Sequence, residues 1–110
     1  MSSDRLDVMA DLIRSIADRK QVPPDQSYTA SLLSKGIEKC AKKFGEEAFE
    51  IALAAVGGNK SRVISEAADV VYHLLVLLES TGVTVSEVMT ELERRQGTSG
   101  IVEKAGRAKD

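Results

Sequence analysis

Residues 66–78, EAADVVYHLLVLL, decide the fold of this chain. They form the centre of a longer region, residues 61–80, that is apolar around most of a helical circumference. A helix of that kind lies in the middle of a structure, because water would otherwise surround its apolar side chains. In a chain of 110 residues, we expect the cover to come from the other helices and from a second subunit. The apolar positions are Val63, Ile64, Ala67, Val70, Val71, Leu74, Leu75, Leu77 and Leu78.

Helical periodicity also precedes this region. Residues 4–20 and 29–56 carry apolar side chains three and four positions apart, as amphipathic helices do. Gly36 leaves open whether the second of these regions is one helix or two. Between them, residues 21–27 read QVPPDQS, and the two adjacent prolines predict a loop.

The sequence after the central region predicts one more helix. Thr84 and Glu87 are spaced as in a capping box, in which each side chain hydrogen-bonds the backbone of the other residue. The helix that they start is expected to end near Arg95. The sequence shows no strand-like alternation, so the predicted fold class is all-α. We expect a single domain, residues 1–110, that forms a small bundle of four to five helices and is completed by dimerisation.

Composition excludes several other classes of protein. The net charge of -2 gives no electrostatic basis for nucleic acid binding. The one cysteine, Cys40, excludes an internal disulfide and a multi-cysteine zinc site. The first residues lack the basic and apolar regions of a secretory signal, and the apolar run from Val70 to Leu78 is too short to span a bilayer. We therefore expect a cytoplasmic protein with neither a nucleic acid nor a membrane partner.

Acidic residues in two stretches are the candidate functional residues. Glu46, Glu47 and Glu50 lie in KKFGEEAFE, and Glu66 and Asp69 begin the central stretch. Helical residues three apart share a face, so Glu47 points the same way as Glu50, and Glu66 the same way as Asp69. Two such helices can bring four carboxylates together, and the cluster repels itself unless cations fill it. Oxygen ligands without a histidine or cysteine cluster suit Mg²⁺ or Mn²⁺.

The alternative interpretation of these acids is ordinary solvated surface. It fits the first stretch well, because Lys43 lies four residues before Glu47, a spacing typical of surface helices. It fits the second stretch poorly, because Glu66 and Asp69 lie on the most apolar helix, where an uncompensated buried charge is costly. The metal site is therefore the favoured interpretation. The lone His73 on the same helix is interpreted as a core residue rather than a ligand.

The spacing of these acids carries a family resemblance. Glu47-x-x-Glu50, followed after fifteen residues by Glu66-x-x-Asp69, resembles the signature of the all-α nucleoside triphosphate pyrophosphohydrolases, the MazG-like superfamily. Within it, the chain resembles the phosphoribosyl-ATP pyrophosphohydrolase family of histidine biosynthesis. No part of the chain resembles the cyclohydrolase domain to which some members are fused. The matching stretches are SYTASLLSKG at 27–36, KKFGEEAFEIALAA at 42–55, EAADVVYHLLVLL at 66–78 and SGIVEKAGR at 99–107.

The resemblance implies a reaction in which phosphoribosyl-ATP and water give phosphoribosyl-AMP and pyrophosphate. A magnesium-bound water would attack between the α and β phosphates, with Mn²⁺ as the alternative ion. The implied metal ligands are Glu47, Glu50, Glu66 and Asp69. Glu46 would orient or deprotonate the water as a catalytic residue, although Glu46 and Glu47 could exchange these roles.

The resemblance also implies partners for the chain. The small-molecule partner is the nucleotide substrate, and the protein partner is a second copy in a homodimer or a dimer of dimers. Candidate substrate-binding residues are basic side chains that would contact the phosphates as point charges. They are Lys42, Lys43 and Arg107, with Arg94, Arg95 and Lys104 as further possibilities.

Two alternatives to this function stay open on the sequence alone. The first is a house-cleaning pyrophosphohydrolase that acts on another nucleotide, such as a non-standard dNTP, with the same metal site and different base and ribose contacts. The second is a small helical interaction module without catalysis, in which the acids are merely solvated. Metal binding and substrate preference separate the three possibilities.

Overall fold

The computed structural model describes residues 4–97, and in that range the chain folds into five α-helices without a strand. The predicted all-α class is therefore confirmed, whereas completion of the bundle by dimerisation stays a prediction. Two short 3₁₀ turns, η1 and η2, separate the first two helices. The elements are α1 (Leu6–Asp18), η1 (Arg19–Gln21), η2 (Pro24–Gln26), α2 (Tyr28–Ser34), α3 (Ile37–Val56), α4 (Lys60–Thr81) and α5 (Val85–Gln96).

The region 29–56 is divided into α2 and α3 at Gly36. Gly36 has φ 94°, a left-handed conformation that side chains other than glycine rarely adopt. The start of α2 is capped by Ser27, whose hydroxyl accepts a hydrogen bond from the Ala30 backbone N–H at 3.1 Å. The question that the sequence left open at Gly36 is thus answered by a two-helix arrangement.

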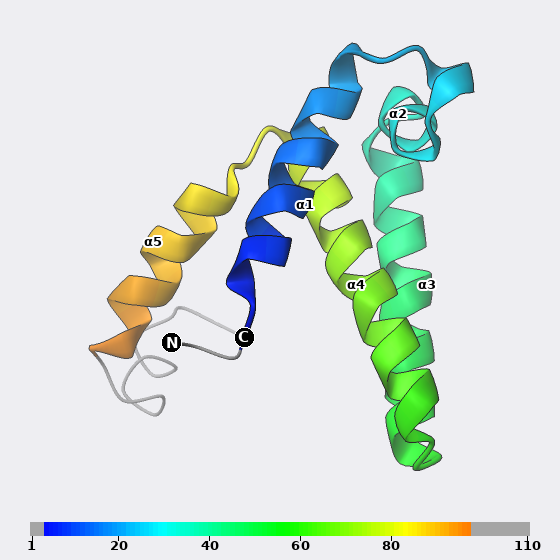
Figure 1. The fold of residues 1–110 in the computed structure, drawn as a ribbon, viewed down its shortest axis with the longest axis vertical. Coiled ribbons are helices and arrows are strands. Elements are labelled where there is room, and N and C mark those ends of the chain that lie inside the picture. The colour runs from blue at the N-terminus through cyan, green and yellow to red at the C-terminus, as the bar shows by residue number, and fades with distance from the viewer. Residues whose placement is uncertain (1–3, 98–110) are drawn as a thin grey trace.

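The central helix of the sequence is also the central helix of the structure. α4 begins after Asn59, whose side chain accepts a hydrogen bond from the Arg62 backbone N–H, and it ends at Gly82 with φ 80°. It packs along the antiparallel α3 on one side and against α1 on the other (Figure 1). The core that α4 helps to form combines residues from four helices, namely Ile16, Leu32, Cys40, Leu75 and Val76.

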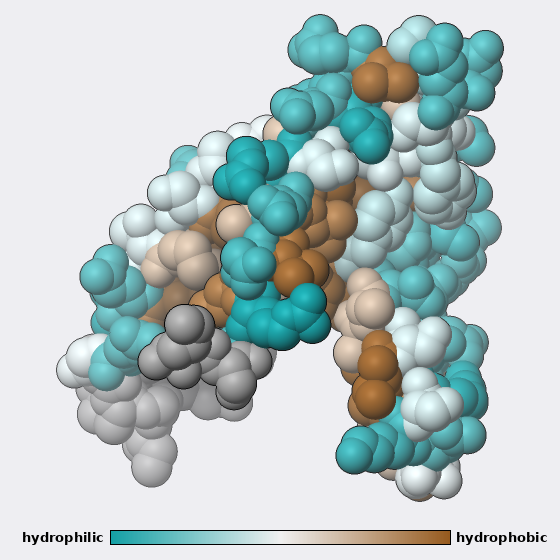
Figure 2. Space-filling view, in the orientation of Figure 1, coloured by the Kyte–Doolittle hydropathy of each residue, from teal (hydrophilic) through white to brown (hydrophobic). Residues whose placement is uncertain are grey.

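The last helix, α5, diverges from the rest of the bundle (Figure 1). Between it, α1 and α4 lies an almost wholly apolar groove with a volume of about 450 Å³. We call it the α1–α4–α5 groove. Figure 2 shows hydrophobic surface gathered on this face among the same helices. The groove is lined by Leu6, Met9, Ala10, Ile13, Val71, Leu74, Leu75, Leu78, Val85, Val88 and Met89.

The capping box predicted for the last helix is confirmed. The Thr84 hydroxyl accepts a hydrogen bond from the Glu87 backbone N–H at 3.1 Å. In return, the Glu87 carboxylate accepts one from the Thr84 backbone N–H at 2.8 Å. These contacts satisfy two backbone N–H groups that have no hydrogen-bond partner within the helix. The hydrogen bond from the Thr84 backbone N–H also holds the pKa of Glu87 below its usual range.

Thr84→Ala is expected to lower the free energy of unfolding by about 1 kcal/mol, because it removes the hydroxyl that caps α5. Thr90→Ala provides the control, since the Thr90 hydroxyl donates a hydrogen bond to the Ser86 carbonyl within the same helix and caps no helix end. Its expected effect is within about 0.5 kcal/mol. Urea unfolding followed by circular dichroism measures both values. Equal losses in the two variants would show that the cap contributes nothing particular to stability.

Among residues 4–97, no single helix has the length and hydropathy needed to cross a membrane. α4 and α5 are long and apolar enough to cross a membrane only when they are counted as one segment. The two helices are bent by 109° relative to each other.

Candidate active site

Three carboxylates converge where α3 and α4 pack side by side. Glu47 extends from α3, and Glu66 and Asp69 extend from α4 one helical turn apart. One oxygen atom from each side chain lies within 4.8 Å of the other two. The i, i+3 spacing places Glu66 and Asp69 on one face, and the antiparallel pairing brings Glu47 to that face. We call these three residues the acid cluster.

Glu66 carries a buried carboxylate oxygen of the acid cluster. Its side chain is 19% exposed, and its Oε1 atom is buried without a hydrogen-bond partner among the described residues. Burial raises the pKa of Glu66 above its usual value, and the neighbouring carboxylates of Glu47 and Asp69 raise it further. Arg62 acts in the opposite direction but does not cancel the rise. The folded protein therefore disfavours negative charge here unless more positive charge is supplied.

The fourth predicted ligand, Glu50, lies beside the acid cluster rather than in it. Its Oε1 accepts a hydrogen bond from Nη2 of Arg62 at 3.4 Å. The same Nη2 atom is 3.8 Å from Oε2 of Glu66. Arg62 was not predicted as a site residue, although its position four residues before Glu66 places it on the same face of α4. The structure thus brings three of the four predicted ligands together and connects the fourth through Arg62.

The acid cluster fits a divalent cation. All the converging donor atoms are carboxylate oxygens, the ligands that Mg²⁺ and Mn²⁺ prefer. A cation would also give the buried Glu66 oxygen the partner that the described protein residues do not provide. The donor chemistry and the buried Glu66 oxygen, which has no hydrogen-bond partner among the described residues, are therefore compatible with a bound cation, and the assignment of the metal ligands stays a prediction.

Of the other predicted site residues on α3, Glu46 and Lys42 are exposed and Lys43 is partly buried. Glu46 is exposed, and its carboxylate is 3.5 Å from the ammonium group of Lys43. The pKa of Lys43 is raised above its usual value, first by Tyr28 and then by Glu46 and Glu47. Lys43 is thus held as a cation near the acid cluster. Lys42 is exposed on the same helix.

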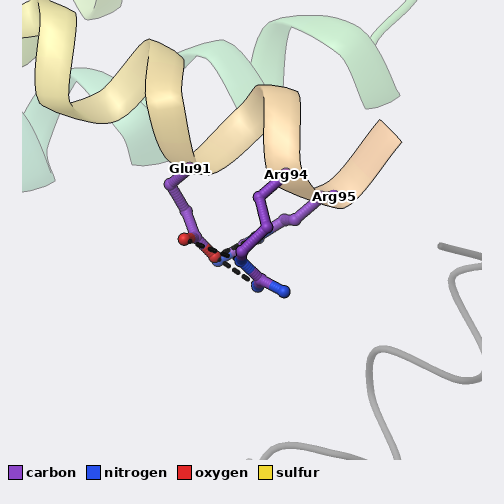
Figure 3. Close-up of polar contacts among 3 residues, drawn as sticks. All are labelled: Glu91, Arg94 and Arg95. Carbon is purple, nitrogen blue, oxygen red and sulfur yellow. Dashed lines mark hydrogen bonds and ion pairs between the residues drawn. The ribbon is translucent and has the colours of Figure 1, made fainter. Parts of the chain in front are cut away.

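The predicted basic residues of the C-terminal part divide into two groups. Arg107 and Lys104 lie outside the described residues. Arg94 and Arg95 lie in the last turn of α5 and both bond Glu91, at 2.6 Å and 2.9 Å (Figure 3). Hydrogen bonds from Arg94 and then Arg95 lower the pKa of Glu91 to about 2. Within the protomer, these two guanidinium groups hold a surface carboxylate of their own helix.

His73 extends the polar face of α4 one turn beyond Asp69 into the protein interior. It is 6% exposed, and its Nδ1 atom has no hydrogen-bond partner among the described residues. Its ring packs edge-to-face with the Tyr72 ring, and the two ring centroids are 4.9 Å apart. Burial lowers the pKa of His73, and the positive charge of Lys43 lowers it further. His73 is therefore a buried residue, as expected of a core position, and its lowered pKa favours the neutral form.

The neutrality of His73 predicts a dependence of stability on pH. A folded-state pKa below the usual value means that the unfolded chain binds a proton more readily, so stability falls as pH drops below about 6.5. His73→Leu is expected to remove this contribution. The check is the difference in unfolding free energy between the wild type and His73→Leu at pH 5.5, 6.5 and 7.5, in the presence of a chelator. A difference that does not change with pH would contradict the assignment of His73 as neutral.

Comparison with known proteins identifies the family of this chain. The family model described as phosphoribosyl-ATP pyrophosphohydrolase matches residues 9–96, which include the whole acid cluster. A phosphoribosyl-ATP pyrophosphatase from a strain of Cereibacter sphaeroides is 58% identical over 102 residues, which cover 93% of this chain and 99% of the relative. The enzyme of the same name from Dinoroseobacter shibae is 57% identical over 102 residues, covering 93% and 100%. The one from Ruegeria pomeroyi is 51% identical over 104 residues, covering 94% and 99%. The chain therefore belongs to the phosphoribosyl-ATP pyrophosphohydrolase family.

Proposed function

We propose that this chain hydrolyses phosphoribosyl-ATP to phosphoribosyl-AMP and pyrophosphate, the second step of histidine biosynthesis. Membership of the family and the names of relatives that align over almost their full length support the proposal. The structural observation that carries it is the convergence of Glu47, Glu66 and Asp69 within 4.8 Å, together with a buried Glu66 oxygen that has no hydrogen-bond partner within residues 4–97. A triphosphate is strongly anionic, so it approaches such acids only with cations between them.

The proposed resident ion is Mg²⁺, with Mn²⁺ as the alternative. Glu47, Glu66 and Asp69 would hold it, and Glu50 would join them once it leaves Arg62. A bound ion of this kind neutralises phosphate charge, polarises the scissile phosphorus and lowers the pKa of an attacking water.

The chain's own residues on α3 supply the remaining parts of the proposed mechanism. Glu46 is exposed and directly precedes Glu47 in the sequence; its carboxylate would orient or deprotonate the water, and Glu47 is the alternative for this role. Lys43 faces Glu46 as a cation and would contact the phosphates, with Lys42 beside it on the exposed face. Arg107 completes the proposed phosphate contacts.

Relative rates with different nucleotides test this proposal. Pyrophosphate release is measured with phosphoribosyl-ATP, ATP and a panel of standard and non-standard dNTPs, each with Mg²⁺. The proposal predicts that kcat/KM for phosphoribosyl-ATP exceeds that for every other nucleotide. A reversed preference would identify a house-cleaning enzyme with the same metal site. Absence of turnover with every nucleotide would favour a non-catalytic helical module.

We also propose that two copies of the chain associate through the α1–α4–α5 groove. The groove is almost wholly apolar, and its lining includes Leu6 at 67%, Leu74 at 40% and Met89 at 49% exposure. An exposed apolar surface of this extent is typical of an interaction site, and a self-complementary two-fold contact is the commonest form in homo-oligomers.

The dimensions of the protomer support association of this kind. Its radius of gyration is 16.1 Å, whereas a compact domain of this length has a radius of about 13 Å. A second set of exposed apolar side chains, Phe49, Leu53, Val56 and Ile64, lies toward the turn between α3 and α4. An open protomer with two uncovered apolar surfaces fits a homodimer or a dimer of dimers. The cytoplasmic location expected from the sequence stays a prediction.

A further inference from the structure

Arg62 occupies the position between the acid cluster and the predicted ligand that lies outside it. Its Nη2 atom bonds Oε1 of Glu50 at 3.4 Å and lies 3.8 Å from Oε2 of Glu66. One guanidinium group therefore forms ion pairs with two carboxylates from different helices. Because Arg62 and Glu66 are four residues apart on α4, Arg62 is held at the edge of the acid cluster by the helix itself.

This arrangement has an electrostatic consequence for cation binding. Arg62 supplies positive charge beside the acid cluster, because its Nη2 atom lies 3.8 Å from Oε2 of Glu66. A divalent cation at the cluster would meet this positive charge at close range and would lack the Glu50 carboxylate. Both effects weaken cation binding for as long as the ion pair between Arg62 and Glu50 persists.

We propose that Arg62 is an internal counter-ion of the metal-free protein, and that a divalent cation binds with Glu50 as a ligand only after the Arg62–Glu50 pair breaks. This inference rests on the proposed function, since it treats the acid cluster as the metal site. Arg62 acts here as a positioning residue for Glu50. The side chains of Arg62 and Glu50 are 48% and 46% exposed. Solvent therefore screens their ion pair, and breaking it costs little free energy.

The affinity for Mn²⁺ in the absence of substrate tests the proposal. Isothermal titration calorimetry of the full chain, freed of metal and kept at constant pH and ionic strength, gives the dissociation constant. Arg62→Gln is expected to bind Mn²⁺ about tenfold more tightly than the wild type, because it removes a competing cation and releases Glu50. Arg62→Lys keeps the charge and is expected to remain closer to the wild type.

Two further variants make the test specific. Arg14→Gln removes the same charge from an exposed ion pair with Asp11 on α1, and it is expected to leave the Mn²⁺ affinity unchanged. In a Glu50→Gln background, Arg62→Gln is expected to tighten Mn²⁺ binding by a smaller factor, because no carboxylate is released. Unchanged or weaker Mn²⁺ binding by Arg62→Gln would overturn the proposal, and so would fully additive effects in the double variant.

The role of Arg62 and the proposed function are tested by different measurements. The affinity comparison uses Mn²⁺ alone, whereas the proposed function fails if the wild type releases no pyrophosphate from phosphoribosyl-ATP with Mg²⁺ or Mn²⁺. A wild type that turns over this substrate, combined with an Arg62→Gln variant of unchanged Mn²⁺ affinity, would overturn only the role of Arg62. A wild type that binds no Mn²⁺ would overturn the metal site and the role of Arg62 together.

Discussion

Glu66→Gln is expected to reduce kcat/KM for pyrophosphate release from phosphoribosyl-ATP by at least about 100-fold, because loss of a group that merely supports a metal ligand already costs 10- to 100-fold. Glutamine keeps the shape of the side chain but removes the negative charge that a divalent cation requires. The measurement is steady-state release of pyrophosphate with saturating Mg²⁺, together with the Mn²⁺ affinity of the variant.

The same substitution is expected to raise the Tm of the metal-free protein. Burial and the carboxylates of Glu47 and Asp69 raise the pKa of Glu66, so the folded state favours an uncharged group at this position. Loss of activity with a gain of stability distinguishes a functional site from a structural one. Glu38→Gln, at an exposed position in the first turn of α3, is the control and should retain activity. A Glu66→Gln variant with wild-type turnover would contradict the assignment of the site.

Leu74→Asp is expected to convert the proposed dimer into folded monomers. Leu74 lines the α1–α4–α5 groove and is 40% exposed in the protomer, so a carboxylate there stays hydrated in the monomer. In a dimer the same charge would be buried without a partner, which costs about 3 kcal/mol or more. Association is therefore expected to weaken by more than about 100-fold. Sedimentation equilibrium measures the dissociation constant, and circular dichroism checks that the variant stays helical.

Ile37→Asp is the control for this experiment. Ile37 is 52% exposed and begins α3, and it is not part of the groove lining. An acidic residue is favourable in the first turn of a helix, so the variant should fold well and associate like the wild type. A Leu74→Asp variant that associates as tightly as the wild type would show that the groove is not the contact surface. Equal dissociation in both variants would contradict the specific use of the groove.

Local patterns were sufficient to predict most of the helices. The apolar spacing gave the central helix to within one residue at each end, and Thr84 with Glu87 predicted the start of α5 correctly. The first helix was predicted to reach residue 20, but α1 ends at Asp18 and the next residues form the tighter η1 turn before the prolines. The division at Gly36 could not be decided, because glycine is tolerated within helices as well as at their ends.

The candidate site was harder to predict, because part of it depends on how one helix lies against another. Glu66 and Asp69 are on one face of α4 by their spacing alone. Whether Glu47 or Glu50 reaches them depends on the register of α3 along α4, and the sequence pattern does not contain that register. The structure places Glu47 in the acid cluster and pairs Glu50 with Arg62. Such a pairing joins residues twelve positions apart, beyond the reach of helical periodicity.

We propose that the acid cluster, loaded with a divalent cation, releases pyrophosphate from phosphoribosyl-ATP. The most direct test is a time course of pyrophosphate release by the purified wild type, first with a chelator and then after excess Mg²⁺ is added to the same sample. We predict no measurable release with the chelator and rapid release of one pyrophosphate per substrate after the addition, with phosphoribosyl-AMP as the other product. Equal rates before and after the addition of Mg²⁺ would contradict a metal-dependent reaction, and release of single phosphate groups would contradict cleavage between the α and β phosphates.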